Sequence, residues 1–481
     1  MTGVTREGGP PRLSFRPAAM LFNSLPFLYG FLPVTYAVFW LLKRKTDRYI
    51  WLTLTGYVFY AFWNYKFCAL MAASTLVSYL AGLGLRAWDD PRRRRLCLIA
   101  PITIDLCLLG FFKYANFGMD TANRVAEWLG LSWYLSGPTI ILPVGISFYT
   151  FHTITYIVDA YRRTITPTRN FFEFSCYVSL FSQLVAGPIV RFKQIEDDLE
   201  HIDRTDRWRS WDLGWSFFTI GMIKKVLLAD TIAAVINPAL AEPATLSTTG
   251  AWLCMLGYAY QIYFDFSGYS DMAVGLGHLF GIRIPQNFDS PYRALDPSDF
   301  WRRWHISLST CLRDYLYIPL GGNRGGAWAT NRNLMITMLL GGLWHGANWT
   351  FVVWGGYHGA LLVAYRLARR PWDALPAPLR RAAMFLLVSV GWVFFRADNL
   401  AVAGELLRAM FGGVAGPIFA GVGLFVPVLA IAAAAAHLGK NSWELRHQWR
   451  PAAAVGLAVL FAVCLGVIYA GFRLPFLYFQ F

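Results

Sequence analysis

Apolar runs long enough to cross a lipid bilayer recur along this chain from Leu21 to Leu474. Each crossing helix needs roughly 20 apolar residues, so these runs leave room for about eleven spans. Composition agrees, because 56% of the 481 residues are hydrophobic and 15% are charged, whereas about a quarter of a soluble domain is charged. The sequence therefore predicts an all-α polytopic membrane protein in which spanning helices are joined by re-entrant or interfacial helices.

The basic residues behind the formal net charge of +15 gather in short loops at 43–48, 92–95 and 161–169. Cytoplasmic loops of membrane proteins carry such an excess of Lys and Arg, so we interpret the charge as a topology signal and expect no nucleic-acid partner. Residues 96–112 would then cross outward and residues 139–160 would cross back. The aromatic stretch between these two spans is expected on the outer side, as an interfacial helix.

The first 19 residues differ from the rest, because they hold three arginines with several Pro and Gly and lack the apolar core of a signal peptide. If loop 43–48 is cytoplasmic, the helix that begins near Leu21 enters from outside, and exporting three arginines opposes the positive-inside tendency. We therefore predict that residues 1–19 are an extension, either disordered or a misassigned start ahead of Met20. Residues 20–481 would form a single transmembrane domain.

The middle of the chain, residues 250–365, has apolar runs that are broken by Gly, Pro, Asp, Arg and His. Irregular backbone and polar groups persist at membrane depth only where protein or a water-filled cavity surrounds them. Residues 333–364 are too long for a simple span, and the glycine pairs at 341–342 and 355–356 are expected breaks or close-contact points. We predict a functional cavity in this region, with residues 261–359 as its catalytic core.

His345 is the ionisable residue of the apolar segment LLGGLWHGANW. A neutral imidazole at membrane depth requires a hydrogen-bond partner. Asn348 lies three residues further on, so on a continuous helix the two side chains share one face. The residues alone leave two interpretations open: a polar pair that joins two helices, or a general base that burial keeps neutral.

His305 follows Arg302 and Arg303 in the segment SDFWRRWHISLSTCLRDYLYIPLGGNRGG, residues 298–326. A stretch this basic and aromatic is not expected to cross the bilayer, and we predict an amphipathic or re-entrant segment near the cytoplasmic face. Its arginines would either contact anionic lipid headgroups or form a cationic mouth for a phosphorylated acyl donor. The glycine-rich turn at 321–326 lacks the spacing of a phosphate-binding P-loop.

Asp271 lies in an apolar block, residues 261–294, that also contains serines suited to helix capping. Ser267 or Ser270 is expected to cap a helix N-terminus, with Asp271 in the first turn. Asp271 and His278 are two helical turns apart and could pair or form a proton path. The chain has no HExxH motif and no GxSxG motif, so we expect neither a metal site nor a serine hydrolase.

Three blocks of this middle region resemble the membrane-bound O-acyltransferase family, namely YFDFSGYSDMAVGLGHLFGI, FWRRWHISLSTCLRDYLYIPLGGNRGG and LMITMLLGGLWHGANWTFVVWGGYHG. Within the family, the chain is similar to the bacterial branch that contains the alginate O-acetyltransferase membrane subunit, and LVAGPIVRFKQI and PFLYFQF are similar to that branch too. The resemblance covers nearly the whole chain from Met20. It implies a funnel-shaped helical bundle whose cavities from both faces meet near mid-membrane.

The resemblance also implies an activity: O-acetylation by a protein of the bacterial inner membrane. The acetyl donor would be a cytoplasmic thioester such as acetyl-CoA, with no permanently bound cofactor. A periplasmic partner of the SGNH-hydrolase type would receive the acetyl group and modify an exported polysaccharide such as alginate. Open alternatives are O-acetylation of peptidoglycan or another glycan, D-alanyl transfer from a carrier protein, a transporter, and a non-catalytic subunit that recruits the partner.

The expected site combines this resemblance with the residue chemistry above. His345 matches the family's essential histidine, and His305 matches an upstream position that is also a histidine in this branch. The expected residues are His345 and His305 for catalysis, and Asn348, Arg302, Arg303 and Asp271 for substrate binding.

Overall fold

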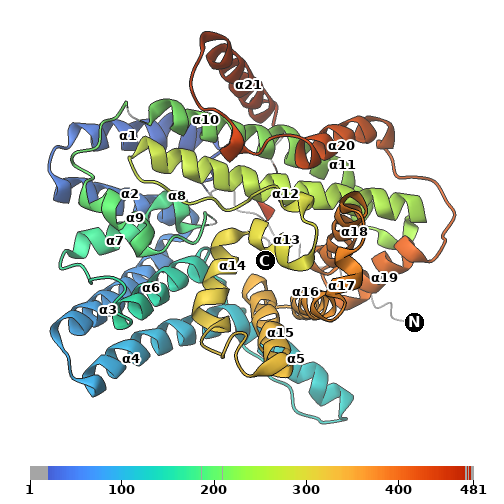
Figure 1. Ribbon diagram of the computed structural model, residues 1–481, viewed down its shortest axis with the longest axis horizontal. Helices are drawn as coiled ribbons and strands as arrows, with labels where there is room; N and C mark the ends of the chain where they lie inside the picture. The colour runs from blue at the N-terminus through green and yellow to red at the C-terminus, as the bar shows by residue number, and fades with distance from the viewer. Residues whose placement is uncertain (1–19, 186, 209, 472–473, 475, 478–481) are drawn as a thin grey trace, which may run out of the picture.

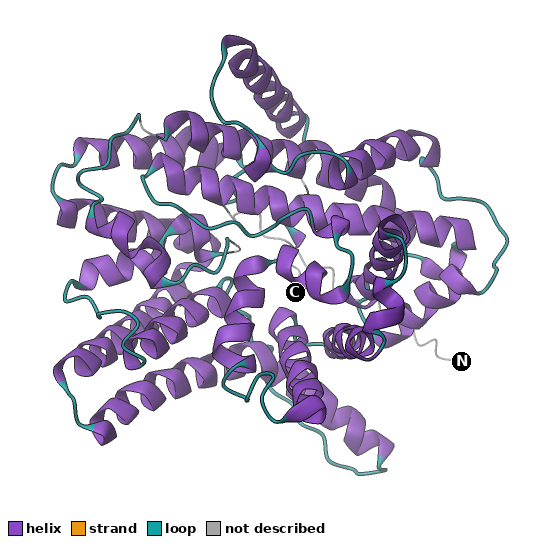
Figure 2. Cartoon of the chain, viewed as in Figure 1, coloured by secondary structure: helices purple, strands orange, loops and turns teal. Residues whose placement is uncertain are grey.

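The computed structural model describes residues 20–185, 187–208, 210–471, 474 and 476–477. Every regular element in these ranges is a helix, and no strand occurs among them (Figure 2). The all-α fold class is therefore confirmed. The predicted extension, residues 1–19, lies outside the described part of the chain.

The N-terminal third forms a group of helices that begin or end at the predicted basic loops. Asp90 caps one of them, since its carboxylate accepts from the backbone N–H of Arg93 at 2.8 Å. An ion pair of 2.7 Å between Arg163 and Asp89 joins the basic loop 161–169 to the turn that precedes helix Pro91–Leu109. Residues 92–95, predicted as a loop, form the start of that helix. We call the side on which these basic residues meet the basic side. The helices are α1 (Leu32–Leu41), α2 (Lys45–Asn64), α3 (Cys68–Ala87), α4 (Pro91–Leu109) and α6 (Ile146–Tyr161).

Helix α4 continues through a π-helical turn, Gly110–Tyr114, into α5, Ala115–Trp128. Figure 1 shows α5 projecting at the margin of the molecule. A helix therefore lies between the two predicted spans, but it ends at Trp128, and residues 131–143 have no regular structure. Because α4 begins on the basic side, the turn and α5 lie toward the opposite side.

The longest helix, α12 (Thr248–Leu279), runs through the middle of the molecule beside α10, Trp211–Met222 (Figure 1). The two helices approach closely at glycines: a Cβ atom on Gly275 would lie 2.5 Å from the carbonyl oxygen of Gly214. Small residues of this kind let helix backbones pack against each other within a membrane. Helix α12 is covered by protein over most of its length.

Helix α12 corrects one expectation. Ser267 and Ser270 do not cap a helix N-terminus, because the backbone is helical without interruption from Thr248. The cap is Ser247, whose hydroxyl accepts from the backbone N–H of Gly250 at 3.2 Å. The apolar turns on both sides of the serines pack against neighbouring helices, and that packing favours continuing the helix over starting a new one.

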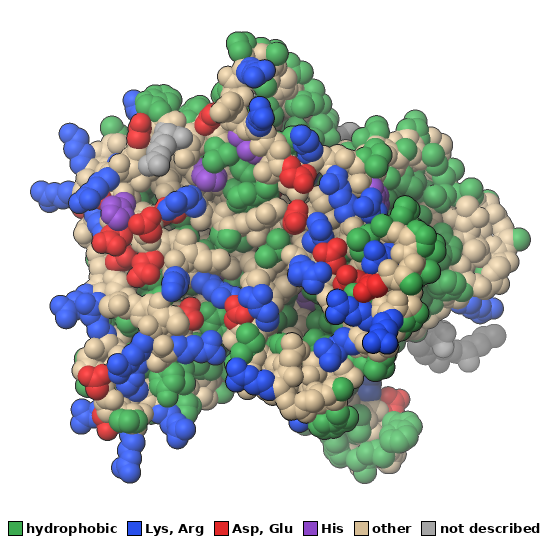
Figure 3. Space-filling view, viewed as in Figure 1, with side chains coloured by type: hydrophobic (Ala, Val, Ile, Leu, Met, Phe, Trp, Pro, Cys, Tyr) green, Lys and Arg blue, Asp and Glu red, His purple; other side chains and the backbone are tan. Residues whose placement is uncertain are grey.

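Residues 298–326 contain no helix of spanning length. They form the short helices α13 (Pro297–Arg303) and α14 (Ile306–Leu312), followed by a π-helical turn and a loop. Arg162, in a basic loop, donates to the carbonyl oxygen of Asp314 at 3.4 Å. The segment therefore lies next to the basic side, as the prediction of a re-entrant or interfacial segment requires, and Figure 3 shows many Lys and Arg side chains on the face that the picture presents.

The segment 333–364 is broken, but not at its glycine pairs. Helix α15 (Gly326–His345) ends at the histidine and α16 (Trp349–Leu367) begins four residues later. One glycine of each pair is a close-contact point instead, because a Cβ atom on Gly342 or Gly355 would collide with a carbonyl oxygen of the facing helix.

The C-terminal third contains α18 (Ala377–Arg396), α19 (Leu400–Phe411), α20 (Val422–His437) and α21 (Pro451–Tyr469). In the described part, four helical segments are long and apolar enough to cross a membrane: Lys45–Ala87, Pro91–Trp128, Ala377–Arg396 and Pro451–Tyr469. Two shorter apolar helical segments, Pro26–Leu41 and Val422–His437, accompany them. The predicted count of about eleven spans stays a prediction, since central helices such as α12 carry polar groups that protein covers.

Candidate active site

His345 is the last residue of α15, and its side chain is buried among aromatic rings. Its ring centroid lies 5.1 Å from that of Trp344, 5.0 Å from that of Trp354 and 5.3 Å from that of Phe395. These three edge-on contacts come from α15, α16 and α18, so three helices together hold the imidazole plane.

His305 lies at the junction between α13 and α14, in the left-handed backbone region with φ 44°. This conformation is uncommon for a residue other than glycine and costs about 1–3 kcal/mol, so surrounding structure must hold it. Asn287 supplies part of that support, because the backbone N–H of Ile306 donates to its carbonyl oxygen at 2.9 Å. The junction between the two short helices therefore holds the backbone of His305, and with it the imidazole, in one position.

A polar network orients the ring of His305. Its Nδ1 lies 3.1 Å from Oδ1 of Asn287, and the Asn287 amide donates to Oγ of Ser270 at 3.1 Å. Ser307 donates its hydroxyl to the same Oδ1 at 2.9 Å. Because Oδ1 of asparagine only accepts, the network assigns the proton to Nδ1 and makes Nε2 the acceptor nitrogen.

The structure brings the two predicted catalytic histidines together. The ring centroids of His305 and His345 are 6.4 Å apart, and the ring of Trp344 contacts both. The ring beside His345 is therefore that of His305, and not the side chain of Asn348, which the three-residue spacing predicts as its neighbour.

The expectation that Asn348 shares a helix face with His345 is wrong. The helix ends at His345, and Asn348 is the N-cap of α16, accepting from the backbone N–H of Thr350 at 3.1 Å. Its amide donates to the carbonyl oxygen of Asp398 at 2.7 Å. A three-residue spacing places side chains on one face only when the helix is continuous.

A cavity of about 440 Å³, the inner cavity, leads from the basic side to His345. Arg302 and Arg313 stand at its exposed end, with 65% and 59% of their side chains accessible. Ser309 and Trp354 line it further in, with several aliphatic side chains. The inner cavity therefore combines a cationic mouth with an apolar interior that ends at an imidazole.

A second cavity of about 180 Å³, the outer cavity, reaches His345 from the other direction. Lys113, Trp344 and residues 142–148 line it. Helix α6 begins at this cavity and ends at the basic loop 161–169, so the two cavities lie toward opposite sides of the bundle. His345 lines both, in agreement with the two-sided funnel that the resemblance implies.

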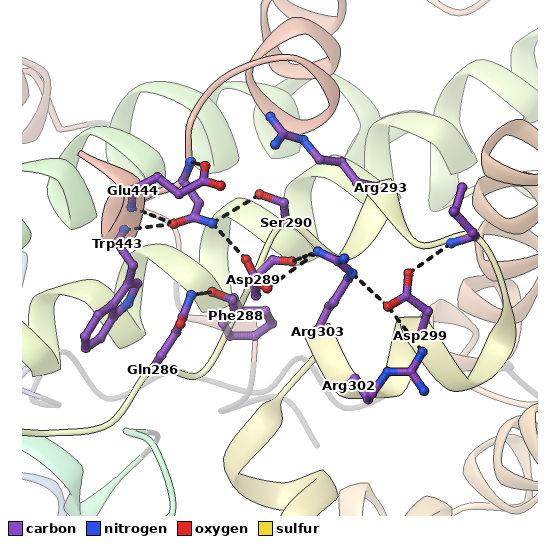
Figure 4. Close-up of polar contacts among 12 residues, drawn as sticks. Gln286, Phe288, Asp289, Ser290, Arg293, Asp299, Arg302, Arg303, Trp443 and Glu444 are labelled. Carbon is purple, nitrogen blue, oxygen red and sulfur yellow. Dashed lines mark hydrogen bonds and ion pairs between the residues drawn. The ribbon is translucent and has the colours of Figure 1, made fainter. Parts of the chain in front are cut away.

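Arg303 points away from the inner cavity, although it neighbours Arg302. Figure 4 shows its guanidinium between Asp299, at 3.0 Å, and Asp289, at 3.5 Å. Asp289 also accepts from the amide of Asn441 at 2.9 Å. Arg303 thus belongs to a network that ties α13 to a C-terminal loop, and it is not among the described residues that line either cavity.

Asp271 likewise lies outside both cavities. Its carboxylate forms an ion pair of 2.6 Å with Lys224 and accepts from the hydroxyl of Ser442 at 2.9 Å. The carboxylate of Asp271 thus pairs with Lys224 and Ser442 instead of the suggested His278, whose ring stacks on Phe217. Two-turn spacing along α12 puts Asp271 and His278 on similar faces, but the carboxylate forms its ion pair with Lys224 of a neighbouring helix.

For three residues of the site the sequence predicted no role: Lys113, Asn287 and Ser307. Lys113 carries a signal that was available, since it is an ionisable residue inside the run LLGFFKYANF. The roles of Asn287 and Ser307 depend on a contact between segments and had no such signal. In the described part of the chain, no group of three or more His, Cys, Asp or Glu residues is placed to hold a metal ion.

Fold and site together define an integral membrane protein in which paired histidines sit where cavities from two sides meet. The sequence profile of the membrane-bound O-acyltransferase family, MBOAT, matches residues 146–395. The chain belongs to this family, and it is an O-acyltransferase.

Relatives with named activities include alginate and peptidoglycan O-acetyltransferases and a D-alanyltransferase. The chain is 47% identical over 403 residues to a probable alginate O-acetylase, AlgI, of Azotobacter vinelandii, covering 82% of this chain and 78% of the relative. It is 38% identical over 432 residues to the peptidoglycan O-acetyltransferase of Helicobacter pylori, covering 82% and 81%. It is 32% identical over 235 residues to a teichoic acid D-alanyltransferase of Streptococcus thermophilus, covering 46% and 56%.

Proposed function

We propose that this chain is an O-acetyltransferase of the bacterial inner membrane, which takes acetyl from cytoplasmic acetyl-CoA for O-acetylation of an exported polysaccharide such as alginate. The observation that carries the proposal is that His345 lines both the inner and the outer cavity. One imidazole can then meet a donor from one side and an acceptor from the other. The names and the coverage of the relatives support acetyl over D-alanyl as the transferred group.

The inner cavity suits a thioester donor with a phosphorylated head. Arg302 and Arg313 at its mouth provide guanidinium groups, which pair with phosphates through two parallel hydrogen bonds. The aliphatic and aromatic lining of the cavity suits the uncharged arm that carries the thioester. The donor's acetyl group would then stop at His345, where the cavity ends.

The chemical step at His345 is a direct acyl transfer. The imidazole takes the proton of the acceptor hydroxyl, and the oxygen attacks the thioester carbonyl. The C–O bond forms, the C–S bond breaks, and the proton passes from the imidazolium to the departing thiolate. His305 lies beside this centre, and the network through Asn287 orients it so that its Nε2 is the acceptor nitrogen.

The outer cavity is where the acceptor would enter. A periplasmic protein of the SGNH-hydrolase type fits this role, because its nucleophilic hydroxyl could accept the acetyl group and pass it to the polysaccharide. The position of the outer cavity, on the side opposite the basic loops, supports delivery from outside. Neither the donor nor the partner needs to cross the membrane in this arrangement.

The test uses inverted membrane vesicles that contain the full-length chain and acetyl-CoA labelled in its acetyl group. Wild-type protein should release free CoA and move label to material inside the vesicles, whereas His345→Gln should lower this rate by about 100-fold or more, since general-base catalysis contributes about 10²–10⁴-fold. His437→Gln, at a histidine that lines neither cavity, is the matched control. Normal label transfer by His345→Gln would refute the proposal and favour a transport or recruiting role.

A further inference from the structure

Lys113 is a buried lysine at the inner end of the outer cavity, on the π-helical turn Gly110–Tyr114. It lies within the candidate membrane span Pro91–Trp128. No ion pair between Lys113 and a carboxylate occurs among the described residues. A cation buried at membrane depth is costly and marks a functional site unless another group compensates it.

The compensating groups are backbone carbonyls at the end of α15. The Lys113 ammonium donates to the carbonyl oxygen of Trp344, to that of His345 at 3.3 Å and to the hydroxyl of Ser147 at 3.4 Å. The neighbouring Tyr114 donates its hydroxyl to the carbonyl oxygen of Leu343 at 2.8 Å. Three consecutive carbonyls, ending with that of His345, thus receive hydrogen bonds from two consecutive residues.

These carbonyls need partners because of where α15 stops. The last four carbonyls of a helix have no intrahelical N–H, and they carry the negative end of the helix dipole. A positive charge at this position therefore stabilises the helix end, and the indole ring of Trp344, 5.7 Å away, adds a cation–π contact. Lys113 lies on a π-helical turn, and such turns occur often at functional sites.

The direction of the His345 imidazole depends on this end of the helix. The chain leaves the helix at Gly346, whose backbone is extended, and the next helix begins at Trp349. A hydrogen bond to the carbonyl oxygen of His345 fixes the peptide plane on which its side chain stands. Lys113 therefore controls the backbone from which the imidazole reaches into both cavities.

We propose that Lys113 is a positioning residue of the acyl-transfer centre: it holds the last turn of α15 so that the imidazole of His345 faces donor and acceptor together. The inference rests on the proposed function and adds to it a residue 231 positions away in sequence from Trp344. Lys113 is not among the described residues that line the inner cavity, so its loss should affect the chemical step and leave donor binding intact.

The test measures kcat and KM for labelled acetyl-CoA in inverted vesicles with equal amounts of membrane-inserted protein. Lys113→Met, which keeps the length and removes the charge and the donors, should lower kcat by about 10-fold or more, because a hydrogen bond to a charged group contributes about 1.5–3 kcal/mol. The KM for acetyl-CoA should stay within about twofold of wild type. Lys113→Arg, which keeps a cation and its donors, should restore most of kcat.

Lys66→Met is the matched control, since Lys66 is exposed in the short turn Tyr65–Phe67 that follows α2, away from the basic side. Tyr114→Phe keeps the test decisive if Lys113→Met fails to accumulate. It releases only the carbonyl of Leu343 and should lower kcat by about two- to tenfold with unchanged KM, as expected for one neutral hydrogen bond.

Wild-type kcat in Lys113→Met, or in Tyr114→Phe should that variant be needed, would overturn the positioning role. So would a change confined to the KM for acetyl-CoA, or an Arg variant as inactive as the Met variant. Parallel measurement of wild type and His345→Gln separates the two proposals. If His345→Gln transfers label normally, the proposed function fails; if only Lys113→Met does, the positioning role alone fails.

Discussion

Lys225 is the centre of a buried ion triad, and its replacement gives the sharpest test of how this bundle is held together. Its ammonium lies 2.6 Å from Asp230 and 2.7 Å from Asp265, and all three side chains are at least 93% covered. Asp265 also accepts from the backbone N–H of Leu477 at 2.9 Å. Lys225→Met would leave two carboxylates buried between helices with no cation between them.

The expected cost follows from that geometry. Removing one partner of a buried ion pair costs about 3–5 kcal/mol, because the remaining charge has neither water nor a counterion. Lys225 serves two carboxylates, so the loss should reach at least this range. The midpoint shift is about 2–4 °C per kcal/mol for 150–250 residues and falls with chain length, so for this chain of 481 residues the apparent unfolding midpoint should fall by about 3 °C or more.

The assay heats detergent-solubilised protein and measures the monodisperse fraction by size-exclusion chromatography. Such unfolding is commonly irreversible, so midpoints are compared at one fixed heating time. Lys43→Met, at an exposed lysine, is the control for the same substitution. The triple variant Lys225→Met, Asp230→Asn, Asp265→Asn should recover much of the loss, because it leaves no buried charge in the triad.

A midpoint for Lys225→Met within about 1 °C of wild type would refute the reasoning, since it would mean that the carboxylates are neutral or hydrated without the lysine. A triple variant no more stable than Lys225→Met would refute it as well, because geometry and not charge would then explain the loss. None of the three residues is among the described residues that line the inner or outer cavity, so activity per folded molecule should be retained.

Two further predictions concern donor binding and the second histidine. Arg302→Gln should raise the KM for acetyl-CoA by about 3- to 30-fold with little change in kcat, because it removes a guanidinium from the cavity mouth. Arg303→Gln, which breaks ion pairs outside the cavity, should instead lower the unfolding midpoint. Equal effects of the two variants on the KM would contradict this assignment. Asn287→Leu should lower kcat by about 5- to 100-fold, because it leaves Nδ1 of His305 and the hydroxyl of Ser307 without their partner at a cost of about 1–3 kcal/mol. Asn287→Asp, which keeps the acceptor oxygen, should lower kcat less, and an Asn287→Leu enzyme with wild-type kcat would show that the network does not matter.

Local pattern was enough for several elements of this protein. Apolar runs predicted spans at 96–112 and 139–160, which α4 and α6 largely cover, because lipid and protein both favour a helix whose backbone hydrogen bonds are internal. The charge of residues 298–326 predicted that they would not form a single span. Where pattern and structure agree, the deciding interactions are short in sequence.

The glycines show where pattern stopped being sufficient. Sequence reasoning marked the pairs at 341–342 and 355–356 as breaks or contacts and could not choose between them. In the structure Gly355 is a close-packing position, and the helix ends before Gly346. Helix α16 packs back against α15, and its N-cap, Asn348, donates to the carbonyl oxygen of Asp398. Asp398, which accepts this hydrogen bond at the break, lies 50 residues from Asn348 in the sequence.

By itself, the sequence determined an all-helical membrane bundle and, through its resemblance to a family, directed attention to His345 and His305. Only the tertiary structure decided which polar groups meet: it joined the two histidines, gave Asp271 to Lys224, and placed Lys113 on the end of α15. The physical reason is that helix formation is a local property of the backbone, whereas a buried polar group takes whichever partner the packing of distant helices brings within hydrogen-bond reach.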